Sequence, residues 1–451
     1  IFIIRLLSPT DYGLMALASI FIGLFSLIET LGLSAAIVNS DELKDDEVSS
    51  ILGFLLLFST ALFACIFLSA GSIARFFGES ELEPILKVLA WRIPIASLTS
   101  VPAAILQRSM NFRAKSIVEF VGAVVSSAAT LAMALKGFAV WALVYGALIL
   151  AAINLVGMLI AAGKFYWPRF NFRALRPHLA FGGYVSLDRI LWYLSSQADV
   201  FFIGKFLGKE VLGIYVVAMQ LATLPMQKVS QILNEVGFAA FSRIQSDKAD
   251  VRKKFLLAVR MVAFLAFPVF FGIAAVSDDV VQALLGEDWL AVALPLLLLP
   301  LTVPLRMLDS ITATVLFGIR RPGRAAGNSL IALLLLSPAF IAASYWGDLL
   351  TVCLVWLLVY PVYFLIALHR TLPLLDASFS DYFRQIYKFV AFGTTMLLAL
   401  AAAHTVWPTA GTNALLALGA YIAAGVVIYS IAQVAFDRAT LQRFMPVSYT
   451  H

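Results

Sequence analysis

The chain has 451 residues, of which 62% are hydrophobic and only 13% are charged, and its mean hydropathy is +0.94. Soluble domains are about half apolar and about a quarter charged. This composition therefore excludes an ordinary soluble enzyme or binding domain. The net charge is +6. It reflects the membrane topology, because the basic residues gather in alternate connections between spans, and it does not indicate binding to nucleic acid.

Apolar segments recur along the chain at the length of about 20 residues that a helix needs to cross a bilayer. In the first part we expect spans near 12–39, 49–73, 84–107, 116–134 and 139–163. The remaining spans are expected near 181–206, 210–238, 256–276, 287–318, 324–345, 347–369, 386–406 and 413–435. The apolar residues 1–4 look like the end of one more, truncated helix. The sequence thus predicts an all-α polytopic membrane protein.

The basic residues alternate from one connection to the next. Of the 32 Lys and Arg residues, 22 fall in every second connection, and only five fall in the opposite set. Cytoplasmic loops carry an excess of Lys and Arg. We therefore predict a multi-pass protein whose N-terminus is cytoplasmic.

An internal repeat is visible in three pairs of loop segments. Residues 5–14 resemble 205–214, 200 positions later, and Phe77-Gly78-Glu79 resembles Leu285-Gly286-Glu287, 208 positions later. The weakest pair, 211 positions apart, is Arg113-Ala114 and Arg324-Ala325. The spacing drifts in one direction, as expected of a duplicated unit with small insertions.

Each repeat contains six spans, so both halves enter the membrane from the same side and are related by an axis along the membrane normal. We predict two pseudo-symmetric six-helix lobes that face a central cleft, which is a transporter architecture. The expected boundaries are 1–170 for the N-lobe and 171–372 for the C-lobe. Two C-terminal helices follow at 373–440, and the tail 441–451 is not expected to be native at its end.

Ionisable side chains inside the spans cost about 2.5–3.5 kcal/mol each on insertion scales, so they mark cavities or pathways. The candidate substrate-binding residues are the basic ones: Arg92, Arg189, Arg306 and Lys228. The candidate coupling residues are the acidic ones: Glu29, Asp188 and Asp309. Arg92 and Arg306 lie on spans that the repeat makes equivalent, and an arginine fork can hold a phosphate or diphosphate by two hydrogen bonds. The alternative is that Asp188, Arg189, Arg306 and Asp309 form ion pairs within a bundle.

The same two spans carry most of the intramembrane prolines, namely Pro94, Pro102, Pro295, Pro300 and Pro304. Prolines break or bend helices, and broken helices often border the substrate site in transporters. Five aromatic residues are candidates either for stacking on sugar rings or for packing: Trp91, Tyr184, Trp192, Tyr193 and Tyr215.

Sequence signals for other activities are missing. There is no phosphate-binding Gly-x-x-x-x-Gly-Lys-Ser/Thr loop, and the four histidines have no Cys or Glu at metal-ligand spacing. Cys65 and Cys353 lie in apolar spans and are most simply packing residues. No cofactor or metal is expected. The external connections are short, which argues against a membrane enzyme.

Several stretches resemble the polysaccharide transporters of the MOP (multidrug, oligosaccharidyl-lipid, polysaccharide) flippase superfamily, in their Wzx-type, lipopolysaccharide-biosynthesis branch. The stretches that carry the resemblance are 5–18, 29–38, 74–78, 106–113, 203–208 and 241–245. The resemblance implies two six-helix lobes that work by alternating access. It also implies a place in the bacterial plasma (inner) membrane.

The resemblance further implies a function for the chain. Such a protein moves undecaprenyl-diphosphate-linked oligosaccharide from the inner to the outer leaflet for surface polysaccharide biosynthesis. Its partners would be this polyprenyl-linked substrate, membrane lipids and other polysaccharide-assembly membrane proteins. Two alternatives stay open: a MATE-like drug or metabolite antiporter, and a membrane glycan polymerase or ligase.

Overall fold

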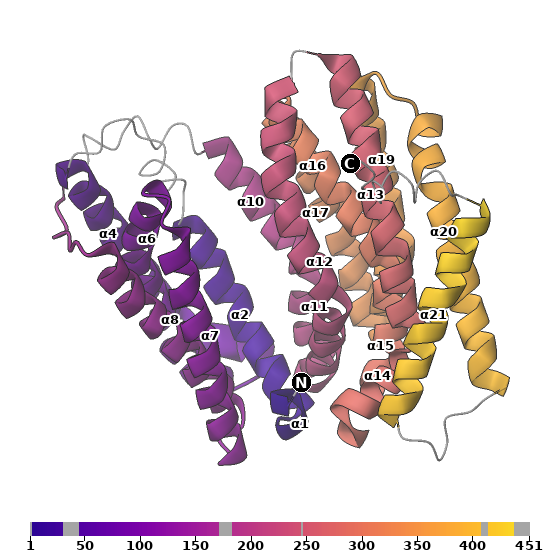
Figure 1. The fold of residues 1–451 in the computed structure, drawn as a ribbon. Helices are drawn as coiled ribbons and strands as arrows, with labels where there is room; N and C mark the ends of the chain where they lie inside the picture. The colour runs from indigo at the N-terminus through magenta and orange to yellow at the C-terminus, as the bar shows by residue number, and fades with distance from the viewer. Residues whose placement is uncertain (1, 30–44, 171–182, 245–246, 407–413, 437–451) are drawn as a thin grey trace, which may run out of the picture. The chain divides into compact units, whose positions relative to one another are not determined.

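The computed structural model describes residues 2–29, 45–170, 183–244, 247–406 and 414–436. Throughout these residues the ordered elements are helices, and no strand occurs among them. Ten of the described helices are long and apolar enough to cross a membrane. The prediction of an all-α polytopic membrane protein is therefore confirmed (Figure 1).

The helices of the first part follow the predicted spans closely. Their bounds are α1 Phe2–Leu6, α2 Pro9–Glu29, α4 Asp45–Phe77, α5 Leu82–Leu89, α6 Arg92–Arg108, α7 Phe112–Leu135, α8 Val140–Ala162, α10 Gly183–Ser196, α11 Ala198–Phe206 and α12 Gly208–Ile244.

The later helices also match the predicted spans, although several of them change helix type along their length. The bounds are α13 Lys248–Ala275, α14 Ser277–Val280, α15 Ala293–Leu298, α16 Val303–Gly318, α17 Pro322–Trp346, α18 Leu349–Leu354, α19 Tyr360–Thr371, α20 Phe379–Val406 and α21 Ala414–Phe436. Segments of 3-10 helix cover Glu287–Val292, Leu299–Thr302 and Leu372–Leu375, and π-helical turns cover Val281–Leu285 and Val355–Val359.

The chain forms two compact units. The first contains Ile1–Val216 and Ser329–Trp346, and the second contains Val217–Asn328 and Gly347–His451. Helices α12 and α17 contribute to both units. The boundaries between the compact units therefore differ from the lobe boundaries that the sequence repeat predicts. The lobe boundaries at 170 and 372 remain predictions.

The first repeat pair takes part in a reciprocal helix contact within the first unit. A Cβ atom on Gly13 of α2 would overlap the carbonyl oxygen of Lys209, and one on Gly213 of α12 would overlap the carbonyl oxygen of Pro9. Each glycine thus leaves room for the backbone of the residue four positions before the other glycine: Gly13 for Lys209, and Gly213 for Pro9. The two copies of the motif pack against each other as equivalent elements.

Next to this crossing, Lys209 connects α12 to the turn between α4 and α5. Its Nζ lies 2.8 Å from a carboxylate oxygen of Glu79 and 3.6 Å from one of Glu81. The hydrogen bond to Glu79, helped by both negative charges, raises the pKa of Lys209 above its ordinary value. The second repeat motif, Phe77-Gly78-Glu79, is therefore part of the same structural cluster.

The other repeat pairs share backbone conformation. Gly78 and Gly286 both have a positive φ, of 78° and 96°, which a glycine adopts without strain. The turns after α6 and α16 are also alike. Asn111 donates its N–H to the carbonyl of Leu106, Arg321 donates its N–H to that of Leu316, and each turn contains a left-handed residue, Met110 and Arg320 respectively.

Both turns have the six-to-one hydrogen bond of a Schellman motif, which satisfies a carbonyl at the end of the preceding helix. They lie 210 positions apart, between the second and third sequence offsets. The turns thus resemble each other near the third sequence pair, but their register of 210 aligns Ala114, and not Arg113, with Arg324.

Prolines interrupt the fourth and tenth spans, as predicted. Pro94 has no N–H, and its ring crowds the carbonyl of Ala90 four residues earlier. Accordingly, the helix is interrupted between α5 and α6 at Ala90 and Trp91. In the tenth span Pro300 is the second residue of a 3-10 segment and Pro304 lies in the first turn of α16. Pro102 lies inside α6 and does not end it.

In the second unit, α13, α20 and α21 lie side by side and bury a shared apolar cluster (Figure 1). Met396 and Leu400 of α20 meet Leu418 and Tyr421 of α21 in this cluster. The hydroxyl of Tyr429 on α21 also donates to the carbonyl of Phe264 on α13, at 2.9 Å. The two C-terminal helices are therefore integral to the second unit.

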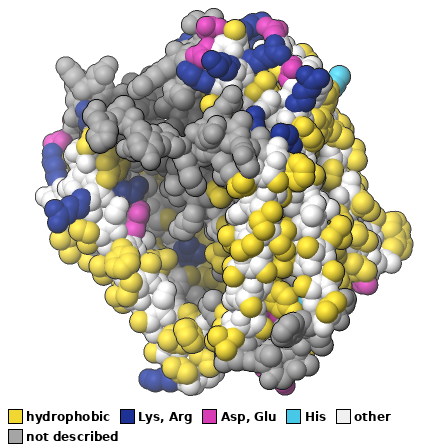
Figure 2. Space-filling view, turned by 45° about the vertical axis from the view of Figure 1, so that its right-hand side comes forward, with side chains coloured by type: hydrophobic (Ala, Val, Ile, Leu, Met, Phe, Trp, Pro, Cys, Tyr) yellow, Lys and Arg dark blue, Asp and Glu magenta, His cyan; other side chains and the backbone are white. Residues whose placement is uncertain are grey.

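Hydrophobic side chains cover the length of the helices, and most Lys and Arg side chains gather near their ends (Figure 2). This distribution is typical of a protein whose helix faces contact lipid, because charged groups are costly in hydrocarbon.

The glycine crossing yields a test of the fold. We expect Gly213→Ala to lower the free energy of unfolding by about 1–3 kcal/mol, because the added methyl group forces α2 and α12 apart. The thermal unfolding midpoint of the purified protein in detergent measures this. Gly419→Ala on α21 is the control, because its Cβ meets no atom within 4 Å. Equal midpoints for the two variants would contradict the reciprocal contact.

Candidate functional site

The second unit carries a polar cluster in the middle of a membrane span. Arg306 and Asp309 lie one turn apart on α16, directly after the proline-broken segment, and both are half-buried. They face aromatic residues from α19 and from the π-helical turn that precedes it.

Two tyrosine hydroxyls satisfy the Asp309 carboxylate. Tyr363 donates to Oδ2 of Asp309 at 3.0 Å, and Tyr360 donates to the same oxygen at 3.3 Å. Both tyrosines are largely buried. These donors stabilise a carboxylate in a medium where an unpaired one is costly.

Arg306 has polarisable partners in place of an anion. Its guanidinium carbon lies 4.5 Å from the ring centroid of Trp356, and Nη1 lies 3.4 Å from the sulfur of Met219. Among the described residues it makes no ion pair, so the alternative, an ion pair between Arg306 and Asp309, does not form in this structure. A cation–π contact attracts the guanidinium without neutralising its charge.

The local sequence explains why the aromatic residues share one face. Trp356, Tyr360 and Tyr363 are spaced i, i+4 and i+7, which places them on one side of a helix. Pro361 lacks an N–H, and the preceding turn widens, so that Tyr360 donates its N–H to Val355 five residues earlier. Such π-helical turns occur frequently at functional sites.

In the first unit, Arg92 is the first residue of α6 and is half-buried. It makes no ion pair with any carboxylate in the part of the chain that the structure describes. Trp91 beside it is 54% exposed, and its ring lies 4.7 Å from that of Phe63. The break between α5 and α6 therefore presents a basic and an aromatic side chain together.

Four further predicted site residues, Glu29, Asp188, Arg189 and Lys228, fall on helices whose side chains at these positions lie outside the described residues. Tyr184 is in the same situation. The roles assigned to all the candidate site residues remain predictions.

The other aromatic candidates separate into two groups. Tyr193 donates to the carbonyl of Ile20 at 2.9 Å, and the hydroxyl of the buried Tyr215 donates to the buried Asp199. These two tyrosines hold helices together within the first unit. Trp192, like Trp91, is exposed.

Sequence reasoning missed the three aromatic residues that surround Arg306 and Asp309. Their i, i+4, i+7 spacing next to a proline was the available signal. In an apolar span this spacing also fits simple packing, so the charged residues of the facing helix were needed to interpret it.

The comparisons with known proteins agree with this architecture. A profile of the family described as polysaccharide biosynthesis protein matches residues 2–294, which is more than half of the chain. The chain belongs to this family. The resemblance to the Wzx-type polysaccharide-transporter branch of the MOP superfamily, inferred from the sequence, is thereby confirmed.

Two relatives in this family are similar over most of their length. Teichuronic acid biosynthesis protein TuaB of Bacillus subtilis (strain 168) is 28% identical over 373 residues, which cover 80% of this chain and 75% of that protein. Lipopolysaccharide biosynthesis protein WzxC of Escherichia coli (strain K12) is 22% identical over 386 residues, which cover 85% and 78%.

A solved structure has the same fold. Lipid II flippase MurJ, in an inward closed conformation, superposes with a TM-score of 0.73 at 15% identity, over 95% of this chain and 94% of that one. At this identity the likeness establishes a MOP-type fold for the family member described here.

The cluster around Asp309 gives a second test. Replacing Tyr360 and Tyr363 by Phe removes both donors, and we expect the free energy of unfolding to fall by about 1–3 kcal/mol. In an Asp309→Leu background the same changes should have almost no effect, because no carboxylate is left to satisfy. Unfolding of all four proteins in detergent completes the double-mutant cycle. Equal losses in both backgrounds would show that the hydroxyls do not serve Asp309.

Proposed function

We propose that this chain is a non-enzymatic flippase. It moves an undecaprenyl-diphosphate-linked oligosaccharide from the cytoplasmic to the outer leaflet of the bacterial plasma membrane, by alternating access, for surface polysaccharide biosynthesis. The family, the relatives named for teichuronic acid and lipopolysaccharide biosynthesis, and the fold shared with a lipid II flippase support the proposal.

One observation carries the proposal. Each of the two proline-broken spans holds a half-buried arginine, Arg92 or Arg306, that makes no ion pair among the described residues. A bare cation in a span is costly unless water or an anionic ligand reaches it. We infer that the transported headgroup supplies this anion.

The chemistry of a diphosphate fits an arginine better than a lysine. A guanidinium presents parallel N–H donors that match two phosphate oxygens, and it stays charged in an apolar setting. The Trp356 face holds the Arg306 guanidinium from one side. A diphosphate can then bind the remaining donors while the polyprenyl chain stays in the lipid.

The carboxylates suggest how transport is driven. Of the three proposed coupling residues, Glu29, Asp188 and Asp309, only Asp309 has described surroundings. Its two tyrosine donors and the nearby Arg306 stabilise the charged form. We propose that binding or loss of a cation or proton at Asp309 accompanies the transport cycle.

A drug or metabolite antiporter on the same fold is the alternative function, since a carboxylate in the membrane suits ion-coupled export of small molecules equally well. The two functions differ in what deletion of the gene affects. Loss of surface polysaccharide with unchanged drug sensitivity favours the flippase, and the reverse favours the antiporter.

Export of polysaccharide tests the role of the arginines. In the gene that encodes this protein, we expect Arg92→Ala combined with Arg306→Ala to reduce surface polysaccharide at least about tenfold, the effect of losing one charge-assisted contact or more. Immunostaining of whole cells with an antibody to the glycan measures the export.

The matched control carries Lys253→Ala and Arg384→Ala, which remove two exposed basic residues near the ends of their helices. Membrane abundance of both proteins is measured by blotting. Full export by the Arg92 and Arg306 variant at normal abundance would refute the proposed diphosphate contact.

The proposed orientation is tested separately with single cysteines in a background without Cys65 and Cys353. Ser80→Cys, on the predicted outer side, should react with a membrane-impermeant maleimide in intact spheroplasts. Gly323→Cys, on the predicted cytoplasmic side, should react only after permeabilisation. The opposite pattern would invert the topology, and with it the direction of transport.

A further inference from the structure

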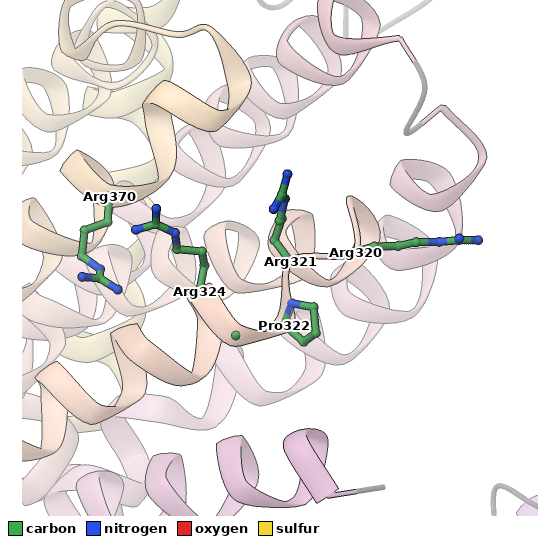
Figure 3. Close-up of a pocket in the computed structure, with 6 residues that line it drawn as sticks. Arg320, Arg321, Pro322, Arg324 and Arg370 are labelled. Carbon is green, nitrogen blue, oxygen red and sulfur yellow. The ribbon is translucent and has the colours of Figure 1, made fainter. Parts of the chain in front are cut away.

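An arginine-lined pocket lies in the second unit, at the turn between α16 and α17 (Figure 3). Its volume is about 510 Å³, and its lining residues are Arg320, Arg321, Pro322, Gly323, Arg324 and Arg370. Arg370 belongs to the last turn of α19, so the pocket brings basic residues from two separate segments together.

The side chain of Arg370 is held in place by α17. Its Nε donates to Oδ1 of Asn328 at 2.9 Å, and Asn328 is only 6% exposed. A Cβ on Gly327 would lie 2.8 Å from Nη2 of Arg370, so this glycine leaves room for the guanidinium. The position of Arg370 is therefore fixed before any ligand binds.

The Arg324 side chain extends toward the side of the pocket where Arg370 lies, the Arg370 side chain turns toward Gly327 and Asn328 of α17, and Arg320 extends away from both (Figure 3). None of the four arginines makes an ion pair within the described parts of the chain. Arg324 and Arg370 line the same pocket, and neighbouring guanidinium groups repel each other unless an anion lies between them. This pair is the part of the pocket that is suited to a ligand.

The repeat shows that the turn itself does not require Arg320 and Arg321, although the first copy carries an arginine, Arg113, next to the position that corresponds to Arg324. The equivalent turn after α6 has the same hydrogen bonds and the same left-handed residue, but it uses Met110 and Asn111 where this one uses Arg320 and Arg321. The residue 210 positions before Arg370 is Ile160. An excess of basic residues in cytoplasmic loops accounts for positive charge here, but not for the buried amide that orients Arg370.

We propose that this pocket binds the phosphate of a lipid headgroup, with Arg324 and Arg370 as the binding pair and Asn328 as the positioning residue. The pocket lies where α16 and α19 end and α17 begins. The ends of membrane spans are where lipid headgroups are expected, and basic pockets between membrane helices bind such groups. Two arginine forks offer more donors than one phosphate needs, and they accommodate a diphosphate equally.

Lipid binding to the purified full chain in detergent tests the proposal by native mass spectrometry. The probes are dioleoyl phosphatidylglycerol, undecaprenyl diphosphate and, as the zwitterionic reference, dioleoyl phosphatidylcholine. We expect Arg324→Ala with Arg370→Ala to weaken binding of an anionic lipid at least about tenfold, as for one lost charge-assisted contact. Binding of phosphatidylcholine should not change.

A second variant keeps the test informative if the double variant is unstable. Asn328→Asp is nearly isosteric, and its carboxylate would pair with Arg370 and neutralise the site, so it should weaken the same lipid. The control Lys253→Ala with Arg384→Ala removes the same number of charges outside the pocket and should bind as the unmodified chain does.

The choice of lipid distinguishes two sources of the phosphate. If the variants lose binding of undecaprenyl diphosphate alone, the pocket is assigned to the substrate, and this assignment rests on the proposed function. A loss for phosphatidylglycerol assigns it to a resident phospholipid and holds whether or not the chain is a flippase. Unchanged binding of both lipids, or an equal loss in the control, would overturn the proposal.

Discussion

The cost of placing charge in hydrocarbon governs this structure. Inside a span, a carboxylate needs hydrogen-bond donors, and a guanidinium needs acceptors or polarisable neighbours, unless water reaches them. Without such partners nothing compensates for their lost hydration. Asp309 meets this requirement with the hydroxyls of Tyr360 and Tyr363. Arg306 meets it with the face of Trp356 and the sulfur of Met219. The carboxylate thus has hydrogen-bond donors within the chain, and the guanidinium has no anionic partner among the described residues.

The fold provides this arrangement by interrupting its helices. Proline creates the break before α16, and a second proline widens the helix before α19, so that the charged face of one meets the aromatic face of the other. In the first unit Pro94 creates the corresponding break, and Arg92 begins the helix that follows. The similar turns after α6 and α16 and the reciprocal contact between Gly13 and Gly213 agree with the repeat predicted from the sequence.

Sequence alone predicted the class of fold, nearly all the spans and the repeat, because each depends on local properties. Apolar length marks a span, and a shared Phe-Gly-Glu or Leu-Gly-Glu marks a turn that needs a left-handed glycine, as Gly78 and Gly286 have. The similarity of the turns at Met110 and Arg320 could not be predicted from the sequence, because it lies in their hydrogen bonds and not in residue type.

The partners of the charged residues could not be predicted in the same way. Arg306 and Asp309 are i, i+3 neighbours, and an ion pair between them was the simple alternative. The rotation of α16 against α19 decides which of the two charged residues contacts Trp356 and which contacts Tyr363. This rotation is set by the packing of helices that lie about 50 residues apart in the sequence. Periodicity identifies the faces of each helix but not the register between two helices.

The central claim is that Arg92 and Arg306 reach water within the membrane. Single cysteines at 92 and 306 test it most directly, with a charged, membrane-impermeant thiol reagent and with Leu68→Cys as the reference. Leu68 is 81% exposed on an apolar helix, so a cysteine there should face lipid and stay unmodified. We expect both arginine positions to be modified from at least one side of the membrane. If neither reacts, while a cysteine at position 80 does, the arginines are sealed from water and have no access to an anionic headgroup.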